Sequence, residues 1–365
     1  MTLTHPRMEL VTSEPSPSPP RLTSVTSPAP RGVWSQLVSA DPASMADHTP
    51  AWTDAIVATG PYRDVSRLYE LTDGRRFVLP LVQRTGPGRL AGLSASFPEG
   101  WGFGGIVGSG QDADVVRLVL TDLAGRRDVH TRLRPNPLDA AMWAAGAPPS
   151  VVTTPKRAHV LELTPDLDAL QEAMHHSARR TLRKAQRSNV TLVCDASARR
   201  IEEYYVLYQR SLARWAAASH EPAWLAQWRG RRRDPIAKLH TMAELLGDRF
   251  RLYLAYVDEQ PVAGQIVLLG NAAHDTRGAM DRDLANRVKA NYLLQWQAIV
   301  DAAEAGCTAL HLGESGTSSG LAAYKERYGA RPVPYLDYRV EHLPVTAVDR
   351  AARRSVKRAI GFKEE

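Results

Sequence analysis

The stretch HLGESGTSSGLAAYKERYGARP, residues 311–332, decides the fold of the second half of this chain. We expect a short buried strand at 308–312, followed by a turn rich in Gly, Ser and Thr at 313–320. A helix should then run over 321–328, because Gly329 and the proline that follows it stop a helix. The pattern therefore predicts a strand, a flexible turn and a helix in close succession.

Tyr324 and Lys325 would lie one turn into this helix. A lysine held beside a strand-to-helix turn can stabilise the negative charge that develops on a carbonyl oxygen during acyl transfer. Most lysines are solvated surface residues, so base rates alone favour an ordinary helix lysine. The remainder of the chain has to decide between these two interpretations.

The length, composition and net charge indicate a globular protein with an excess of basic residues. With 365 residues the chain exceeds the size at which one core usually keeps growing, so we expect two domains. Hydrophobic residues make up 44% and charged residues 23%, both ordinary for a globular chain. The formal charge of +7 favours an anionic partner such as a nucleic acid, a nucleotide or a phosphorylated substrate.

Several classes of protein do not fit the sequence. Cys194 and Cys307 lie far apart without metal-ligand spacing, so we expect no disulfide framework, no metal site and no cofactor. The first residues lack the apolar run of a secretory signal, and no run of about 18 apolar residues would span a membrane. We therefore expect a cytoplasmic protein.

The N-terminal half begins with a segment of low complexity. Residues 12–30 are dominated by Pro, Ser and Thr, so we expect residues 1–30 to be a disordered tail. Order should begin near Val33, and the runs 67–71 and 76–83 flank an Asp-Gly turn that is typical of a hairpin.

A glycine-rich loop follows at 94–110, around Trp101. Its last part, Gly108-Ser109-Gly110, precedes a helical pattern and could cradle a phosphate at a helix N-terminus. No Walker lysine follows it, which favours a plain irregular loop.

A second unit begins near residue 158 with a strand and continues with a helix expected over 168–187. Basic side chains crowd the polar faces of this helix and repel one another there. They form either a solvated face or a patch for the phosphates of a nucleotide or RNA. These candidate phosphate-binding residues are Arg179, Arg180, Arg183, Lys184 and Arg187.

The later segments predict a mixed sheet with helices on it, which is the α+β class. We expect strands at 190–194, 250–257, 262–269, 274–280, 308–312 and 334–341, with helices at 196–218, 221–246, 291–305, 321–328 and 345–361.

The order of these elements resembles the Fem family of aminoacyltransferases. The segments that carry the resemblance are RRTLRKAQRSNVTL (179–192), NYLLQWQAIVDAAEAGC (291–307) and GLAAYKERYGARP (320–332). The resemblance implies two tandem GNAT-like domains, each a central mixed sheet flanked by helices. The first would occupy 31–157 and bind the acceptor, the second 158–344 would carry the Tyr-Lys motif, and 345–365 would be a basic C-terminal helix.

Fem-like enzymes carry an amino acid from an aminoacyl-tRNA to an amine of a peptidoglycan precursor or a specialised metabolite. The resemblance implies that Lys325 matches the functional lysine of the family and that Tyr324 is the aromatic residue beside it. The expected partners are therefore an aminoacyl-tRNA donor and an amine acceptor.

The acyl donor could be either an aminoacyl-tRNA or an acyl-CoA. A typical GNAT domain holds the pyrophosphate of coenzyme A with a glycine-containing turn, whereas residues 281–294 contain no glycine. This difference favours aminoacyl-tRNA, although Arg287 and Lys289 could bind phosphates through their side chains. The alternatives are an acyl-CoA-dependent GNAT N-acyltransferase and a non-catalytic nucleic-acid-binding protein.

Direct attack of an amine on an activated ester needs no enzyme nucleophile. We assign Lys325 as the oxyanion donor or leaving-group stabiliser and Tyr324 as a positioning residue. Glu314 and Ser315 are candidates for orienting the amine, with turn and cap residues as the alternative reading. The full set of expected substrate-binding residues is Arg277, Asp281, Asn291, Glu314, Ser315 and Trp101.

Overall fold

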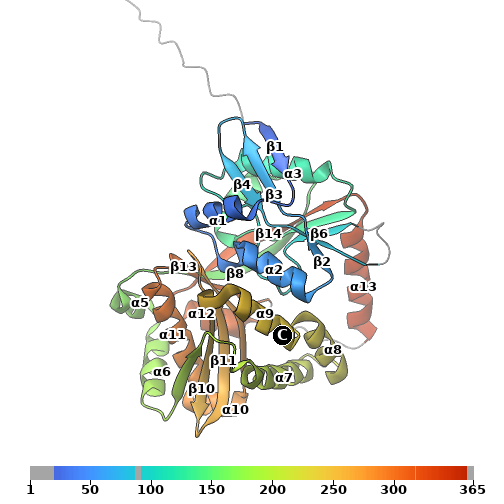
Figure 1. The fold of residues 1–365 in the computed structure, drawn as a ribbon. Helices are drawn as coiled ribbons and strands as arrows, with labels where there is room; N and C mark the ends of the chain where they lie inside the picture. The colour runs from blue at the N-terminus through green and yellow to red at the C-terminus, as the bar shows by residue number, and fades with distance from the viewer. Residues whose placement is uncertain (1–19, 87–91, 317, 360–365) are drawn as a thin grey trace, which may run out of the picture.

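The computed structural model describes residues 20–86, 92–316 and 318–359, and its chain forms an α+β fold around one large mixed sheet (Figure 1). An eleven-stranded sheet runs through both halves of the chain, and a separate three-stranded sheet lies at the N-terminal end. The expected α+β class is therefore confirmed.

The first half builds one end of the large sheet and the whole of the small one. Its elements are β1 (Leu22–Thr26), α1 (Arg31–Ala40), η1 (Ala46–His48), α2 (Pro50–Thr59), β2 (Tyr62–Asp64), β3 (Arg67–Leu71), β4 (Arg76–Leu79), β5 (Val82–Arg84), β6 (Leu93–Ser96), α3 (Ala113–Ala124), β7 (His130–Leu133), η2 (Pro137–Asp139), α4 (Ala140–Gly146) and β8 (Val152–Glu162).

The second half supplies the remaining strands and most of the helices. Its elements are α5 (Leu167–Ala173), α6 (His176–Gln186), β9 (Thr191–Asp195), α7 (Ile201–Ala218), α8 (Ala223–Arg233), α9 (Ile236–Leu246), η3 (Gly247–Arg249), β10 (Phe250–Val257), β11 (Gln260–Leu268), β12 (Ala273–Met280), α10 (Arg282–Val288), α11 (Ala290–Glu304), β13 (Ala309–Glu314), α12 (Ser319–Glu326), β14 (Arg331–Glu341) and α13 (Val345–Ala359).

The large sheet has the order β2-β5-β6-β7-β14-β8-β13-β12-β11-β10-β9. Neighbours are antiparallel except for β6 with β7 and β12 with β13, which are parallel. Each half thus has antiparallel strands that end in one parallel pair. The last strand, β14, lies between the halves, because it pairs with β7 on one side and β8 on the other.

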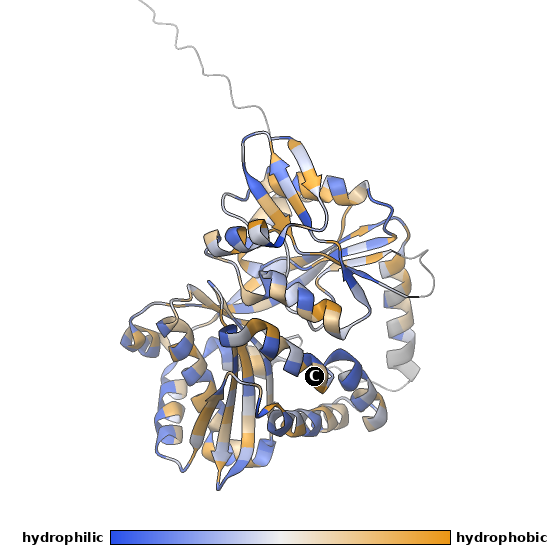
Figure 2. Ribbon diagram, in the orientation of Figure 1, coloured by the Kyte–Doolittle hydropathy of each residue, from blue (hydrophilic) through white to orange (hydrophobic). Residues whose placement is uncertain are grey.

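Helices cover both faces of the second half of the sheet. On one face α11 packs against β10 and β11, and α6 lies on α11; α7 packs on β11 and β12 of the other face, with α9 on β10. Because both faces are covered, β10 and β11 are almost continuously buried, and most of their residues are hydrophobic or aromatic (Figure 2).

The two halves share a core. Trp52, Phe97 and Trp101 of the first half lie in one buried cluster with Tyr204 and Met242 of the second half. The helix α2 packs directly on α9 across this junction. This contact places the glycine-rich loop of the first half beside the sheet of the second.

The expectation that residues 1–30 form a disordered tail is wrong for its last part. Residues 1–19 lie outside the described residues, but β1 pairs with β3 within the segment that we expected to be disordered. Leu22 and Val25 pack against the core under the small sheet, and this contact, together with backbone pairing, outweighs the poor composition of the segment.

Several expected boundaries also differ. The helix expected at 168–187 breaks into α5 and α6 at Met174, whose backbone is extended there. The strand expected from residue 158 begins earlier, since β8 starts at Val152. The proposed boundary between domains at 157/158 falls inside this continuous strand, and the division into domains stays a prediction.

In the described part of the chain, no helix combines the length and the apolar character needed to cross a bilayer.

Candidate active site

A cavity opens where two parallel strands separate. The strands β12 and β13 pair only through Ala273 with Leu310 and His274 with His311. Beyond these pairs β12 continues to Met280 while β13 turns away, which leaves a gap between them. The cavity at this gap has a volume of about 790 Å³.

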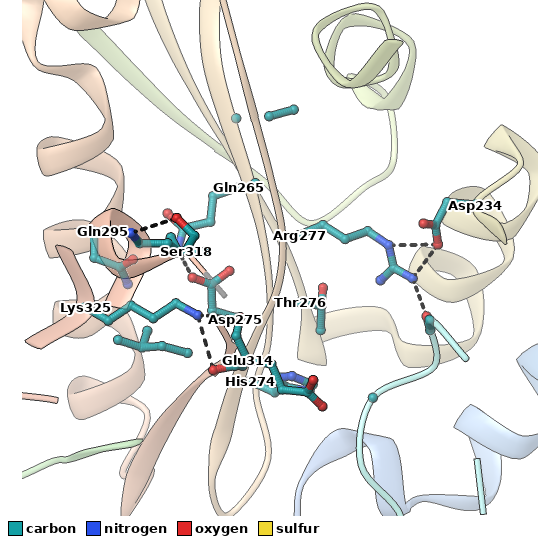
Figure 3. Close-up of a pocket in the computed structure, with 18 of the residues that line it drawn as sticks. Asp234, Gln265, His274, Asp275, Thr276, Arg277, Gln295, Glu314, Ser318 and Lys325 are labelled. Atoms are coloured by element: carbon teal, nitrogen blue, oxygen red, sulfur yellow. Dashed lines mark hydrogen bonds and ion pairs between the residues drawn. The ribbon is translucent and has the colours of Figure 1, made fainter. Parts of the chain in front are cut away.

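The cavity wall is built from both halves of the chain (Figure 3). The glycine-rich loop of the first half contributes Glu99, Gly100, Gly102 and Phe103, and the second half contributes β11, β12, α11, the end of β13 and α12. Its polar lining includes Arg134, Lys156, Asp234, Gln265, His274, Asp275, Arg277, Asn291, Gln295, Glu314, Ser318 and Lys325.

Lys325 is buried in this wall and only 6% exposed. Ser318 caps the N-terminus of α12 by accepting a hydrogen bond from the Leu321 N–H, which fixes the start of the helix. The Lys325 Nζ then donates to the carbonyl oxygens of Gly313, at 3.2 Å, and Glu314, at 2.9 Å. An ammonium group has three N–H donors, so one remains for a bound molecule.

The charges of Lys325 and Asp275 depend on each other. Burial lowers the pKa of Lys325 to about 8, although the carboxylates of Asp275 and Glu314 oppose this shift. Burial raises the pKa of Asp275 to about 6, against the charges of Lys325 and His274 and a 2.8 Å hydrogen bond from Gln265 Nε2. Near pH 7 both groups are mainly ionised, which creates a polar centre inside an enclosed cavity.

Tyr324 lines the cavity and holds α12 against α11. Its hydroxyl donates to the Asn291 carbonyl oxygen at 3.0 Å, and its ring packs edge-on against Tyr292 and Tyr328. Burial raises the pKa of Tyr324 far above its usual value, so the phenol stays neutral. Tyr324 therefore supports the position of Lys325 on the same helix.

The structure brings together some of the expected site residues and separates others. The wall contains Lys325, Tyr324, Arg277, Asn291 and Glu314. Asp281, Ser315 and Trp101 are not part of it.

Arg277 and Glu314 are held by protein groups within the wall. The Arg277 Nη2 atom donates to Asp234 Oδ1 and to the Gly100 carbonyl oxygen, each at 2.7 Å. Glu314 accepts from the Tyr335 hydroxyl at 2.6 Å and from Lys156 Nζ at 3.3 Å. Arg277 thus fixes the glycine-rich loop to β12.

The three residues outside the wall have structural partners. Ser315 Oγ lies 3.2 Å from His159 Nδ1. Asp281 caps α10 by accepting from the Leu284 N–H at 3.3 Å. The Trp101 ring lies under Lys238, whose Nζ is 3.9 Å from its centroid.

The basic residues of α6 form a face away from the cavity wall. Arg180, Arg183, Lys184 and Arg187 are exposed and Arg179 is half-buried, while the apolar side of α6 lies on α11. Within residues 20–86, 92–316 and 318–359, no acidic side chain pairs with any of these five. They remain available to an anionic partner.

The glycine-rich segment before α3 has no phosphate cradle. The Gly108 N–H donates to Asp41 and the Ser109 hydroxyl donates to the Ala40 carbonyl oxygen. Asp112 already caps α3, so a carboxylate stands where a phosphate would bind. The segment therefore matches the plain loop that we considered.

Sequence reasoning missed several polar residues of the cavity. His274 and Asp275 are adjacent in β12, and Gln295 lies on α11 with its Nε2 buried and without a partner in the described residues. Polar side chains in a strand of a covered sheet were the available signal for His274 and Asp275. No group of three or more His, Cys, Asp or Glu in the described residues is arranged to hold a metal ion.

Comparison with known proteins identifies the fold. Residues 173–326 match the model of the acetyltransferase (GNAT) domain family. A search of curated proteins gives no match.

Two solved structures share the architecture at low sequence identity. The crystal structure of FemX has a TM-score of 0.62 and 11% identity, and the match covers 86% of this chain and 97% of FemX. A conserved protein of unknown function from Bacteroides thetaiotaomicron has a TM-score of 0.53 and 12% identity, covering 85% of this chain and 97% of that one.

A tandem GNAT protein from the clavulanic acid biosynthesis pathway also matches, with a TM-score of 0.49, 13% identity and coverage of 87% of this chain and 98% of that one. Within this chain, one parallel pair of strands recurs in each half. The chain therefore has the Fem-like GNAT fold, built from two GNAT-like domains.

Proposed function

We propose that this protein is an acyltransferase that moves an amino acid from an aminoacyl-tRNA to an amine. The observation that carries the proposal is the buried Lys325 ammonium in the cavity between the separated strands. A buried, preorganised cation beside an open cavity is suited to stabilise an oxyanion, because it is not screened by bulk water.

The proposed reaction needs no covalent enzyme intermediate. The acceptor amine attacks the carbonyl carbon of the ester, and Lys325 donates a hydrogen bond to the oxygen that becomes negative. The C–O bond to the tRNA ribose then breaks, and the ribose hydroxyl leaves. Gln295, whose Nε2 lacks a partner in the described chain, lines the same cavity and offers a donor to bound substrate.

The helix that follows β12 supports the choice of donor. In a coenzyme-A-dependent domain the N–H groups at this position would face a pyrophosphate. Here Asp281 accepts from the Leu284 N–H, so a carboxylate occupies the N-terminus of α10 and repels phosphate. The exposed basic face of α6 supplies charge for an RNA backbone instead.

The acceptor would reach the cavity beside the first half of the chain. Glu99, Gly100, Gly102 and Phe103 of the glycine-rich loop line the cavity together with Glu314, whose carboxylate could bind an ammonium group. The proposed acceptor is an amine of a peptidoglycan precursor or of a specialised metabolite.

A direct transfer assay tests this proposal. The protein is incubated with a pool of charged tRNAs and a panel of amines, and the products are searched by mass for new amides; a parallel reaction contains acetyl-CoA. We expect an amide only with charged tRNA. An amide formed only with acetyl-CoA would favour the coenzyme-A-dependent alternative, and tRNA binding without any amide would favour a non-catalytic RNA-binding protein.

A second assay tests the basic face of α6. Replacing Arg180, Arg183 and Lys184 with Gln should weaken tRNA binding and flatten its dependence on salt, by roughly 0.7–0.9 in log–log slope for each phosphate that is no longer neutralised. The matched control replaces Arg76, Arg117 and Arg127, which are exposed in the first half, and removes the same charge. Equal weakening by both triple variants would mean that only net charge matters.

A further inference from the structure

A buried aspartate–histidine pair forms another part of the cavity wall. His274, in β12, is 4% exposed and lines the cavity, and Asp47, in η1, is fully buried behind it. The Nδ1 atom of His274 lies 2.8 Å from Asp47 Oδ2. The pair joins the two halves of the chain at the base of the cavity.

Asp47 is ionised in this environment. Burial alone would raise its pKa, but the charge of His274 and its hydrogen bond, with smaller effects of His48 and the Phe103 N–H, lower the pKa below the usual value. An ionised carboxylate accepts hydrogen bonds, so the Nδ1–H of His274 donates to Asp47. When the ring is neutral, it keeps a lone pair on Nε2.

Nothing in the described chain bonds to that second nitrogen. Since His274 lines the cavity, this nitrogen is the ring atom left for a bound molecule. The ring is kept in place by Phe103, whose centroid lies 5.1 Å away. His274 thus presents an oriented ring nitrogen to a bound molecule.

The groups around the ring allow it to accept a proton. Besides Asp47, the titratable neighbours are His48 of η1, His311 of β13 and Asp275 of β12. Burial lowers the pKa of His48, and burial lowers that of His311 to about 3, so both are neutral near pH 7. The charged groups next to the ring are therefore the carboxylates of Asp47 and Asp275, which lie where the ring would gain a positive charge on accepting a proton.

We propose that His274 is the catalytic base that takes a proton from the acceptor amine, with Asp47 as its positioning residue. This inference rests on the proposed acyl transfer. It adds the group that removes a proton from the amine, which Lys325 as a cation does not supply.

An acceptor that enters as an ammonium gives one proton to Nε2, and the freed electron pair forms the C–N bond to the ester carbonyl carbon. The C–O bond to the ribose breaks, its electron pair stays on the ribose oxygen, and that oxygen takes the second proton of the amine. The imidazolium then releases its proton to solvent, so the products are an amide, a free hydroxyl and one proton.

Single variants separate this role from a structural one. His274→Gln should lower kcat by about 100-fold to 10,000-fold and remove the rise of kcat with pH, since general base catalysis contributes on this scale. His311→Gln is the matched control, because His311 is an equally buried histidine without a partner in the described residues, and it should stay within about twofold. Asp47→Asn should lower kcat more than it raises KM.

Chemical rescue gives a second readout. In His274→Ala the space left by the ring joins the cavity, so added imidazole should restore part of the rate and should act more strongly where it is unprotonated. A purely structural histidine would give no rescue. Equal losses in His274→Gln and His311→Gln, with the pH profile unchanged in shape, would overturn the proposal.

The protonation state is tested without any activity. Nitrogen-15 spectra of histidine-labelled protein, compared with His274→Gln to assign the signals, should show a protonated Nδ1 and an Nε2 that gains its proton as the pH is lowered. A ring with the hydrogen on Nε2, or one that never titrates, would overturn the proposal. If the wild type forms no amide from any donor, the proposed function fails, and these spectra still decide whether His274 is an open proton acceptor.

Discussion

Lys325 carries a charge that changes close to neutral pH. Its folded-state pKa is lowered to about 8, so the ammonium is present below that pH and is lost as the pH rises through it. If the ammonium stabilises the oxyanion, transfer should decline above about pH 8. Lys325→Arg should keep its charge and lose this decline, while Lys325→Met should lose about 100-fold or more at all pH values.

Rate–pH profiles of the three proteins with the same amine and ester check this expectation. The rate also rises with pH because the amine substrate loses its proton. This rise is common to all three proteins, so it cancels when the variants are compared with the wild type. A transfer rate of Lys325→Met within about twofold of the wild-type rate would contradict the oxyanion role of Lys325.

Gly102 is the residue that allows the Asp47–His274 pair to form. Its φ is +73°, and a Cβ there would collide with the Asp47 carboxylate and lie 3.1 Å from His274 Cε1. Gly102→Ala should therefore displace the pair and abolish most transfer activity. Gly74 is a matched control, because its φ is +82° and no atom lies within 4 Å of the added Cβ.

Both substitutions place alanine at positive φ, which costs about 1–3 kcal/mol of strain. Thermal unfolding should show a loss of stability for both variants. Only Gly102→Ala should lose more activity than the loss of folded protein explains. Full activity in Gly102→Ala would mean that the pair is not required.

At the residue scale the sequence predicted Lys325 and Tyr324 but not the histidine and its carboxylate. The Tyr-Lys pair lies in one helix, so a local motif reveals it. Asp47 and His274 are separated by 227 positions, and only the packing of η1 against β12 brings them together. No spacing rule for neighbouring residues predicts such a contact.

At the scale of elements, a buried charge cluster fixes α8 and α9 to β12 and the glycine-rich loop. Asp234 accepts from Arg277 Nη2 at 2.7 Å, from Arg233 Nε at 2.8 Å and from Lys238 Nζ at 2.9 Å. Lys238 and Arg277 each also donate to the Gly100 carbonyl oxygen. One carboxylate therefore neutralises cations from three elements.

Asp234→Asn should destabilise the protein by about 3–5 kcal/mol, because it leaves buried cations without a counter-charge. Burial alone would raise the pKa of Asp234, but the charges of Arg277, Lys238 and Arg233 hold it far below its usual value. The ionised Asp234 thus makes its full contribution to the free energy of unfolding above about pH 4, and this contribution falls as the pH drops further.

Denaturant unfolding of wild type and Asp234→Asn from neutral to acid pH measures this contribution. The difference between them should shrink as the pH falls below about 4. Asp73→Asn, at an exposed hairpin turn, is the control and should leave stability unchanged. A constant difference at every pH would show that charge is not the cause.

Elements were predicted well where the local signal was strong and poorly where tertiary contacts decide. The strands β10 and β11 were expected, and the turn that joins them consists of Asp258 and Glu259, both at positive φ. The strand β1 was missed because its Pro- and Ser-rich surroundings carry a strong signal for disorder. Its pairing with β3, about 45 residues later, outweighs that local signal.

At the scale of the whole molecule, the two units share one sheet. The sequence indicated two units, each with its own sheet, but β14 comes from the end of the chain and pairs with β7 and β8. These partners lie roughly 200 positions away, so pairing across the units is not visible in local patterns. The shared strand makes the two units depend on each other for stability.

This dependence predicts one cooperative unfolding transition. Asp337 in β14 is fully buried and accepts from Arg132 Nη2 at 2.6 Å and Arg134 Nε at 3.3 Å, both on the β7 side. Asp337→Asn should leave these cations unbalanced, cost about 3–5 kcal/mol and lower one shared midpoint. Calorimetry of the wild type should give equal calorimetric and van't Hoff enthalpies.

The control is Glu162→Gln, because Glu162 pairs with Arg331 of β14 on the exposed side of the same strand, where an ion pair contributes about 0–1 kcal/mol. Hydrogen exchange in β6 and β7 should accelerate together with exchange in β10 and β11 when Asp337 is replaced, since unfolding of either unit removes a neighbour of β14. Two separate transitions in the wild type, or faster exchange confined to β6 and β7 in Asp337→Asn, would mean that the units unfold independently despite their common sheet.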